Sequence, residues 1–173
     1  MDINKRRFFI FLDIDGVMYD LKFIKERIKN KDIKNGGLLS TFKPESVMAL
    51  NYLTKTLSNH YDVTLVISST WRFAFKRILK MLIKNGVNLN CKIDKTSGNL
   101  NRFNRGKEVI DYLKEKCFVG ANDDFVIIDD ENFNYNKYFD KKMIIKTNIL
   151  NNALSMSQVI KFTSSLFPLE KNI

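Results

Sequence analysis

The sequence has few of the residues that interrupt or cross-link a protein chain. Only 7 of its 173 residues are glycine and 2 are proline, so long flexible or proline-rich linkers are excluded. Internal repeats and low-complexity blocks are absent as well. The 2 cysteines, Cys91 and Cys117, have neither the spacing of a zinc site nor the number that a disulfide framework needs. We therefore expect a single domain over residues 1–173, with Cys117 as a buried free thiol at the end of a helix.

Long apolar runs are also missing, which limits where the protein can reside. The apolar run at residues 8–12 follows three basic residues, but Asp13 ends it after five residues. This run is shorter than the hydrophobic region of a signal peptide or a membrane span. The sequence therefore predicts a cytoplasmic protein that does not bind a membrane. The glycine-rich loop Gly-x-x-x-x-Gly-Lys-Ser/Thr is absent too, which excludes a P-loop kinase.

Positive charge exceeds negative charge in this chain. Lys and Arg number 29 against 19 acidic residues, which gives a net charge of +10. A basic surface attracts polyanions, and this favours nucleic acid or another phosphorylated substrate as a partner. The same excess of lysine, together with many Asn and Ile residues, is what an AT-rich genome would encode without selection for charge. Charge alone therefore does not decide between these two explanations.

Apolar runs alternate with amphipathic segments along the chain. Runs that are apolar on both faces are typical of central strands in a parallel sheet, and they occur here at residues 8–14, 63–67 and 125–128. Shorter strands are predicted near residues 91–93 and at 143–146. Helical spacing of apolar residues predicts helices over 44–57, 71–84, 106–116 and 155–167. This alternation predicts an α/β protein, a Rossmann-like three-layer sandwich with a central parallel sheet and helices on both faces.

Acidic and hydroxyl side chains end each of the three central strands. Ligands of parallel sheets bind beyond the carboxyl ends of the strands. The candidate site residues are therefore Asp13, Asp15, Ser68, Ser69, Asp129 and Asp130. Carboxylates that lie close together repel one another unless a cation lies between them, and Mg²⁺ prefers oxygen ligands. The sequence thus predicts a Mg²⁺ site made by the four aspartates, one of which can act as a nucleophile toward phosphorus.

Four segments occur in the order of the four motifs of the haloacid dehalogenase (HAD) superfamily of phosphatases. The segment Phe-Leu-Asp13-Ile-Asp-Gly-Val resembles the first motif, and residues 63–68, a hydrophobic strand that ends in serine, resemble the second. Arg105-Gly106, at the start of an amphipathic helix, is similar to the third motif. Residues 126–130, which end in two acids, resemble the fourth. The resemblance implies the HAD-type α/β fold.

The resemblance also implies a role for each acid. Asp13 is expected to be the nucleophile that forms an aspartyl-phosphate, and Asp15 the general acid and base. Asp13 and Asp129, together with the backbone carbonyl of Asp15, are expected to hold Mg²⁺. Asp130 is expected to contribute to the metal site directly or through water.

The phosphate group is expected to contact hydroxyl and basic side chains. By the same resemblance, Ser68, with Ser69 beside it, binds the phosphoryl oxygens. Arg105 offsets the negative charge on the intermediate. Lys107 is a second candidate for that role, because it lies at the start of the same helix.

Two gaps between the motifs bear on the substrate. Residues 17–42 and 87–104 span about 26 and about 18 residues, too few for a separate domain of ordinary size. We expect no large cap domain, with 17–42 as a small flap, and an open site that admits the end of a nucleic acid. The chain also resembles the phosphatase domain of polynucleotide kinase 3′-phosphatases. The alternatives are a small-molecule or nucleotide phosphatase with 17–42 as a lid, and a non-catalytic nucleic-acid-binding module with the same fold.

Aromatic residues near the motifs have two interpretations. Trp71 follows the Ser68 loop directly, so it can stack on a base or pack under the helix that it begins. The aromatic residues of the segment 133–139 are expected to pack in the core or at the sheet edge.

Overall fold

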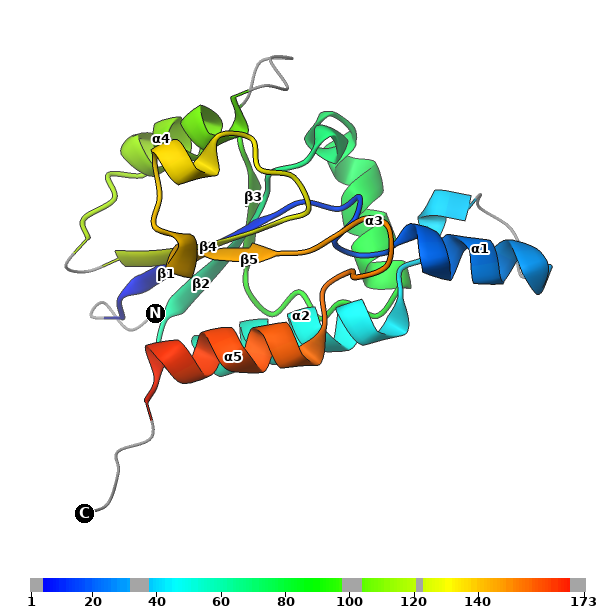
Figure 1. Cartoon of the computed structure of the whole chain (residues 1–173). Helices are drawn as coiled ribbons and strands as arrows, with labels where there is room; N and C mark the ends of the chain where they lie inside the picture. The colour runs from blue at the N-terminus through cyan, green and yellow to red at the C-terminus, as the bar shows by residue number, and fades with distance from the viewer. Residues whose placement is uncertain (1–4, 32–37, 98–103, 121–122, 169–173) are drawn as a thin grey trace.

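A computed structural model describes residues 5–31, 38–97, 104–120 and 123–168. Its centre is a sheet of five parallel strands in the order β3-β2-β1-β4-β5 (Figure 1). The strands are β1 (Arg7–Leu12), β2 (Asp62–Ile67), β3 (Lys92–Lys95), β4 (Asp123–Asp129) and β5 (Ile144–Lys146). The first strand in the chain is therefore the middle strand of the sheet.

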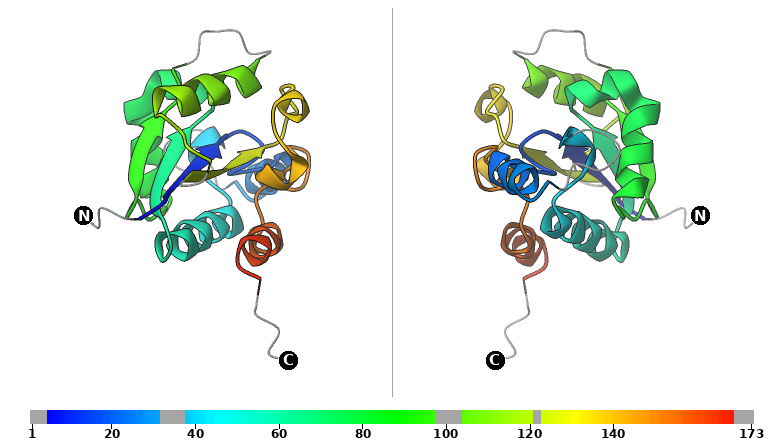
Figure 2. Two further views of the ribbon diagram at one scale, coloured as in Figure 1. Left: turned by 90° about the vertical axis from the view of Figure 1, so that its left-hand side faces the viewer. Right: turned by 90° about the vertical axis from the view of Figure 1, so that its right-hand side faces the viewer.

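Helices cover both faces of the sheet because β1 is apolar on both faces. Its side chains Phe8 and Ile10 pack in a core with helices α2 (Pro44–Ser58), α3 (Phe75–Lys84) and α5 (Met156–Leu166). The alternate residues Phe9 and Phe11 pack against α4 (Arg105–Glu115). Figure 2 shows α2 and α5 on one side of the sheet and α4 on the other. The structure is the three-layer sandwich that the sequence predicts.

Local sequence signals set the ends of several helices. Pro44 occupies the first turn of α2, where its missing N–H is not needed. Ser155 caps α5 and forms a reciprocal pair of hydrogen bonds with Gln158. Asp20 caps α1 (Leu21–Lys29) by accepting a hydrogen bond from the backbone N–H of Phe23. Short 3₁₀ helices connect other elements: η1 (Leu38–Ser40), η2 (Thr70–Ala74), η3 (Tyr135–Lys137) and η4 (Lys141–Met143).

The predicted elements are confirmed apart from details of their ends. The first strand ends at Leu12 and not at Ile14, because the chain turns there to begin the loop of the acids. The helix predicted from Trp71 begins as the 3₁₀ helix η2, and α3 starts only at Phe75. The prediction for Cys117 was wrong: its side chain is exposed, because the residue lies past the end of α4 with a φ of 51°.

The segment between β1 and α2 is small. Its described part contains α1 and η1, while residues 32–37 of the predicted flap lie outside the described residues. The described residues contain no separate cap domain. A flap role for 17–42 and a single domain over 1–173 stay predictions. Within the described ranges, no helix has the length and apolar character required to cross a membrane.

Candidate active site

The strand register brings three loop starts together at the carboxyl edge of the sheet. Leu12 of β1 is paired with Ile67 of β2 on one side and with Ile128 of β4 on the other. The pairing continues one residue further, since the N–H of Asp13 donates to the carbonyl of Ile128 at 3.0 Å. The N–H of Ser68 likewise donates to the carbonyl of Leu12 at 2.9 Å. Asp13 therefore lies between the ends of β2 and β4.

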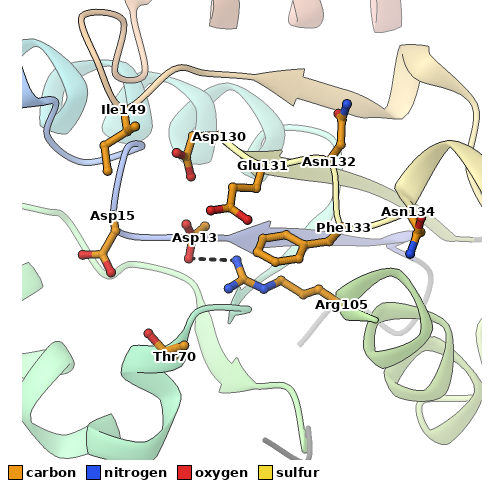
Figure 3. Close-up of a pocket in the computed structure, with 10 residues that line it drawn as sticks. All are labelled: Asp13, Asp15, Thr70, Arg105, Asp130, Glu131, Asn132, Phe133, Asn134 and Ile149. Atoms are coloured by element: carbon orange, nitrogen blue, oxygen red, sulfur yellow. Dashed lines mark ion pairs between the residues drawn. The ribbon is translucent and has the colours of Figure 1, made fainter. Parts of the chain in front are cut away.

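Three carboxylates form a cluster at this edge. One oxygen from each of Asp13, Asp129 and Asp130 lies within 4.8 Å of the others. Asp13 is 5% exposed and Asp129 is 1% exposed. Figure 3 shows Asp13 and Asp130 on the wall of the pocket described below. The sequence predicted this convergence of acids from separate strands, and these three aspartates do converge in the structure.

Arg105 contacts two of the three acids. It is the first residue of α4, and its Nη1 lies 3.1 Å from Oδ1 of Asp13 and 2.9 Å from Oδ2 of Asp129. The guanidinium carbon also lies 4.0 Å from the ring centroid of Phe133, which is a cation–π contact. Lys107, the other predicted candidate, is exposed and is not among the residues that line the pocket. The geometry favours Arg105 as the basic residue of the site.

The proton affinities of this cluster reflect burial and crowding. Burial raises the pKa of Asp13 well above its ordinary value, the charge of Asp129 adds to this, and Arg105 opposes it. Burial also raises the pKa of Asp129, although Arg105 and two hydrogen bonds partly offset the effect. Burial and the charge of Asp129 raise the pKa of Asp130 to about 6. Burial alone would lower the pKa of Arg105, but Asp13 and Asp129 raise it. The raised pKa values show that Arg105 alone does not offset the cost of ionising three carboxyl groups this close together.

The donor set fits a hard divalent cation. All three groups offer carboxylate oxygens, which Mg²⁺ prefers. Gly16 makes the close approach of the third acid feasible: a Cβ on this glycine would lie 2.4 Å from Cγ of Asp130. Its φ of 74° is also a conformation that other residues rarely adopt. The carboxylate of Asp15 is not part of the cluster, so only its backbone carbonyl remains as the ligand that the family resemblance implies.

Asp15 is instead held by two aromatic side chains. Its Oδ1 accepts hydrogen bonds from the hydroxyl of Tyr19 and, at 3.1 Å, from Nε1 of Trp71. Among the described residues, none donates to its Oδ2. Sequence reasoning missed Tyr19, because a tyrosine four residues after an acid carries no distinctive signal. For Trp71 the sequence suggested either stacking on a base or packing under a helix. Neither interpretation includes the hydrogen bond to Asp15.

The two serines after β2 differ in their partners. Ser68 is 1% exposed, and its Oγ has no hydrogen-bond partner among the described residues. The Oγ of Ser69 accepts a hydrogen bond from the backbone N–H of Trp71 at 3.5 Å, and the Ser69 hydroxyl also favours the ionised form of Asp13 and so lowers its pKa. A buried hydroxyl without a partner is costly, so the Ser68 hydroxyl is suited to a ligand oxygen.

A pocket of about 780 Å³ opens above the acids. Figure 3 shows the ten residues that line it: Asp13, Asp15, Thr70, Arg105, Asp130, Glu131, Asn132, Phe133, Asn134 and Ile149. Sequence reasoning assigned the aromatic residues of 133–139 to packing alone. Tyr135 is indeed buried, but its hydroxyl donates to Oδ2 of Asp129 at 2.8 Å, and Phe133 lies over Arg105. The position of this segment directly after Asp129-Asp130 is the signal that could have indicated such a role.

One comparison with known proteins covers nearly the whole chain. A family model described as "HAD domain in Swiss Army Knife RNA repair proteins" matches residues 9–159. The matched range includes every residue of the cluster and every residue that lines the pocket. Among curated proteins, none matches the sequence.

Proposed function

The chain belongs to the family of HAD domains in Swiss Army Knife RNA repair proteins, and from this premise we propose that it is a Mg²⁺-dependent phosphatase acting on the phosphorylated ends of nucleic acids. HAD domains are generally hydrolases of the phosphatase type. The proposal assigns the nucleophile to Asp13 and the general acid and base to Asp15. It assigns phosphate binding to Ser68, Ser69 and Arg105.

The observation that carries the proposal is the cluster of Asp13, Asp129 and Asp130 beside Arg105. Three carboxylates within 4.8 Å of one another, two of them buried, are unfavourable unless cations lie beside them. A phosphoryl group needs positive charge around its oxygens and an oxygen nucleophile in line with the leaving group. Arg105 supplies positive charge and Asp13 supplies the oxygen nucleophile, and the two side chains are in contact.

In the first step, a carboxylate oxygen of Asp13 attacks phosphorus, and the bond from phosphorus to the leaving oxygen breaks. Asp15 gives its proton to the leaving oxygen, so that the product departs as an alcohol. The hydrogen bonds of Tyr19 and Trp71 to Oδ1 leave Oδ2 as the oxygen that carries this proton. Arg105 and the Ser68 hydroxyl neutralise charge on the phosphoryl oxygens.

In the second step, Asp15 removes a proton from water, and the water oxygen attacks phosphorus. The bond between phosphorus and Asp13 breaks, which releases inorganic phosphate and restores the carboxylate. Bound Mg²⁺, held by Asp13, Asp129 and Asp130, would supply positive charge against the phosphoryl oxygens and against the nucleophile.

Three observations support a nucleic-acid end as the substrate. The family is described by its presence in RNA repair proteins. The described residues contain no cap domain over the pocket, so a long substrate has access. The net charge of +10 favours a polyanion. The assignment to 3′-phosphate ends follows the resemblance to the phosphatase domain of polynucleotide kinase 3′-phosphatases.

The test is phosphate release from a 3′-phosphorylated oligonucleotide, a mononucleotide and an aryl phosphate, each with and without Mg²⁺. We expect Mg²⁺-dependent turnover of the oligonucleotide and the aryl phosphate. Replacing the nucleophile in Asp13→Asn should lower kcat by about 10⁴-fold or more. The matched control is Asp111→Asn, the same change at an exposed acid of α4, which should retain full activity.

Two results would contradict this proposal. Turnover of mononucleotides without turnover of oligonucleotides would favour a nucleotide phosphatase. Equal inactivity of the unmodified protein and Asp13→Asn on all three substrates, with Mg²⁺ and with other divalent cations, would favour a binding module.

A further inference from the structure

We propose that η2 and the exposed side of α3 form a binding surface for single-stranded nucleic acid, which leads the strand into the pocket. The inference rests on the proposed function and extends it to residues outside the pocket. Bases stack on Phe73, and the phosphates that follow pair with Lys76, Arg77 and Lys80.

The first argument is a local excess of positive charge. Between Asp62 and Asp94 the chain has six basic residues and no acidic residue. Arg72 and Lys92 have acidic partners elsewhere. The other four belong to α3 and form no ion pair within the described part of the chain: Lys76, Arg77, Lys80 and Lys84. Positive charge that no acidic side chain of the described residues neutralises is suited to an external polyanion.

The second argument is an exposed aromatic ring with a rigid support. Phe73 is 57% exposed, and the guanidinium carbon of Arg72 lies 4.8 Å from its ring centroid. Arg72 itself is buried and fixed, because it donates to the carbonyl of Ser69 and to Glu108, each at 3.0 Å. A ring held in this way loses little entropy when a base stacks on it, and bases of any sequence can stack.

The third argument is the position of this surface next to the pocket. Thr70, the first residue of η2, lines the pocket, as Figure 3 shows. Trp71 follows and donates to Asp15, and the guanidinium of Arg77 lies 5.6 Å from its ring. Phe73 is three residues after Thr70, about 6 Å further along a 3₁₀ helix. A strand whose terminal phosphate lies at Asp13 therefore has the ring of Phe73 as a neighbour.

Acidic proteins and anionic membranes also bind lysine-rich helices, but they fit these observations less well. Neither makes use of a flat aromatic ring that is supported by an arginine. Neither partner explains why the basic residues follow directly after Thr70, which lines the pocket proposed to bind phosphate. Nucleic acid accounts for the ring, the charge and the position together.

The test measures binding of a fluorescent single-stranded RNA, phosphorylated at its 3′ end, to the full chain without Mg²⁺, by anisotropy. Phe73→Ala should raise Kd about tenfold, the effect of losing one stacked base, and Phe73→Trp should restore binding. The double change of Lys76 and Lys80 to Gln should reduce the slope of log Kd against log salt by about 1.4, or 0.7 for each lost phosphate contact. The matched control changes Lys22 and Lys25 to Gln on α1, where both are exposed, and should leave Kd unchanged.

Hydrolysis of an aryl phosphate by the same variants separates this inference from the proposed function. We expect the Phe73 and lysine variants to lose turnover of the oligonucleotide relative to that of the aryl phosphate. If the unmodified protein hydrolyses nothing but its RNA affinity still depends on Phe73 and the lysines, the proposed function fails and the binding surface stands. RNA binding that is indifferent to these changes would overturn the inference. So would equally tight binding of polyglutamate or phosphatidylserine vesicles through the same side chains.

Discussion

Gly16 is the residue at which the backbone of the first loop meets the acid cluster. Two separate constraints apply to this residue. Its φ of 74° is a backbone conformation that residues with a Cβ rarely adopt, and a Cβ at this position would lie only 2.4 Å from Cγ of Asp130. Gly86 shares the first constraint alone, because its φ is 84° and a Cβ there would meet nothing within 4 Å. Comparing substitutions at Gly16 and Gly86 therefore separates the effect of backbone strain from the effect of displacing Asp130.

We predict that Gly16→Ala and Gly86→Ala each lower the free energy of unfolding by about 1–2 kcal/mol, the cost of a left-handed conformation with a Cβ. Only Gly16→Ala should also raise the Mg²⁺ concentration for half-maximal activity, by roughly tenfold or more, because it displaces Asp130. Urea denaturation and Mg²⁺ titration of activity measure the two effects. An unchanged Mg²⁺ requirement in Gly16→Ala would exclude Asp130 from the metal site.

Tyr19 provides a second prediction. Tyr19→Phe removes one donor to Asp15, so the carboxyl group loses orientation, and kcat should fall about tenfold with little change in KM. Tyr112→Phe is the matched control: Tyr112 is also 2% exposed and also donates to an aspartate, Asp94, at 2.9 Å, but lies in the other core cluster. Steady-state kinetics of both variants decide the question. Equal loss of kcat in the two would indicate a general effect on packing.

At the residue scale, the sequence predicted correctly those positions that depend only on the geometry of the backbone. Asp13, Ser68 and Asp129 follow from the rule that side chains at the carboxyl ends of parallel strands meet. The contacts of Tyr19 and Tyr135 depend on how loops fold back over that edge and on side-chain rotamers. These are not encoded in any periodic pattern, and the sequence did not reveal them.

At the scale of the elements, Asp20 connects three segments. It is fully buried and accepts hydrogen bonds from the N–H of Phe23 at 2.8 Å, from Nζ of Lys43 at 3.0 Å and from the N–H of Ala153 at 3.2 Å. Burial alone would raise the pKa of Asp20, but these three donors outweigh it and hold the pKa below the ordinary value of 3.8. The start of α1, the start of α2 and the loop before α5 therefore share one anion.

We predict that Asp20→Asn lowers the free energy of unfolding at neutral pH by about 2 kcal/mol, because the charge-assisted bonds are lost. Since the folded-state pKa is depressed, the carboxylate stabilises the fold above pH 3.8, and this contribution disappears as the pH falls through the lower folded-state pKa. The difference between the two proteins should thus shrink in acid. Chemical denaturation from pH 7 to pH 3 measures it.

Asp140→Asn is the control for that change, since Asp140 caps η4 with an exposed side chain and should alter stability by less than about 0.5 kcal/mol. A pH-independent loss in Asp20→Asn would contradict the role assigned to the charge.

The elements themselves were largely predictable, for physical reasons. A strand such as β1, which is buried on both faces, must be apolar throughout, and a helix such as α2 must place apolar residues every three or four positions. The 3₁₀ helices have three to five residues, which is too short for such a period. The sequence therefore placed the helix at Trp71 too early and missed η3 and η4.

At the scale of the whole molecule, the proposed binding of Mg²⁺ at the acid cluster would be coupled to folding. A ligand that binds only the folded state stabilises it, by about 2.7 kcal/mol at a hundredfold excess over Kd. For a chain of this length we expect Mg²⁺ to raise Tm by roughly 5–10 °C. Differential scanning fluorimetry with Asp129→Asn and with the control Asp111→Asn tests this. An equal shift in both variants would place the ion elsewhere.

The family and the architecture could be predicted from the order of four short motifs and from the alternation of apolar strands with amphipathic helices. The substrate could not be predicted in the same way, because the walls of the pocket come from segments such as 131–134, and the conformation of these segments depends on packing. The part of 17–42 that lies outside the described residues leaves the flap hypothesis as a prediction.

The central place of β1 has a consequence for how the candidate site re-forms after denaturation. Phe8 pairs with Val63 on one side and with Asp124 on the other, so the last pairing closes a loop of more than a hundred residues. Contacts so distant along the chain form late and slowly. A chain interrupted before β4 would keep the pairing of β1 with β2 but lack Asp129 and Asp130, so the three-carboxylate cluster could not form. Re-formation of that cluster on refolding would therefore report the completed topology, not local helix formation.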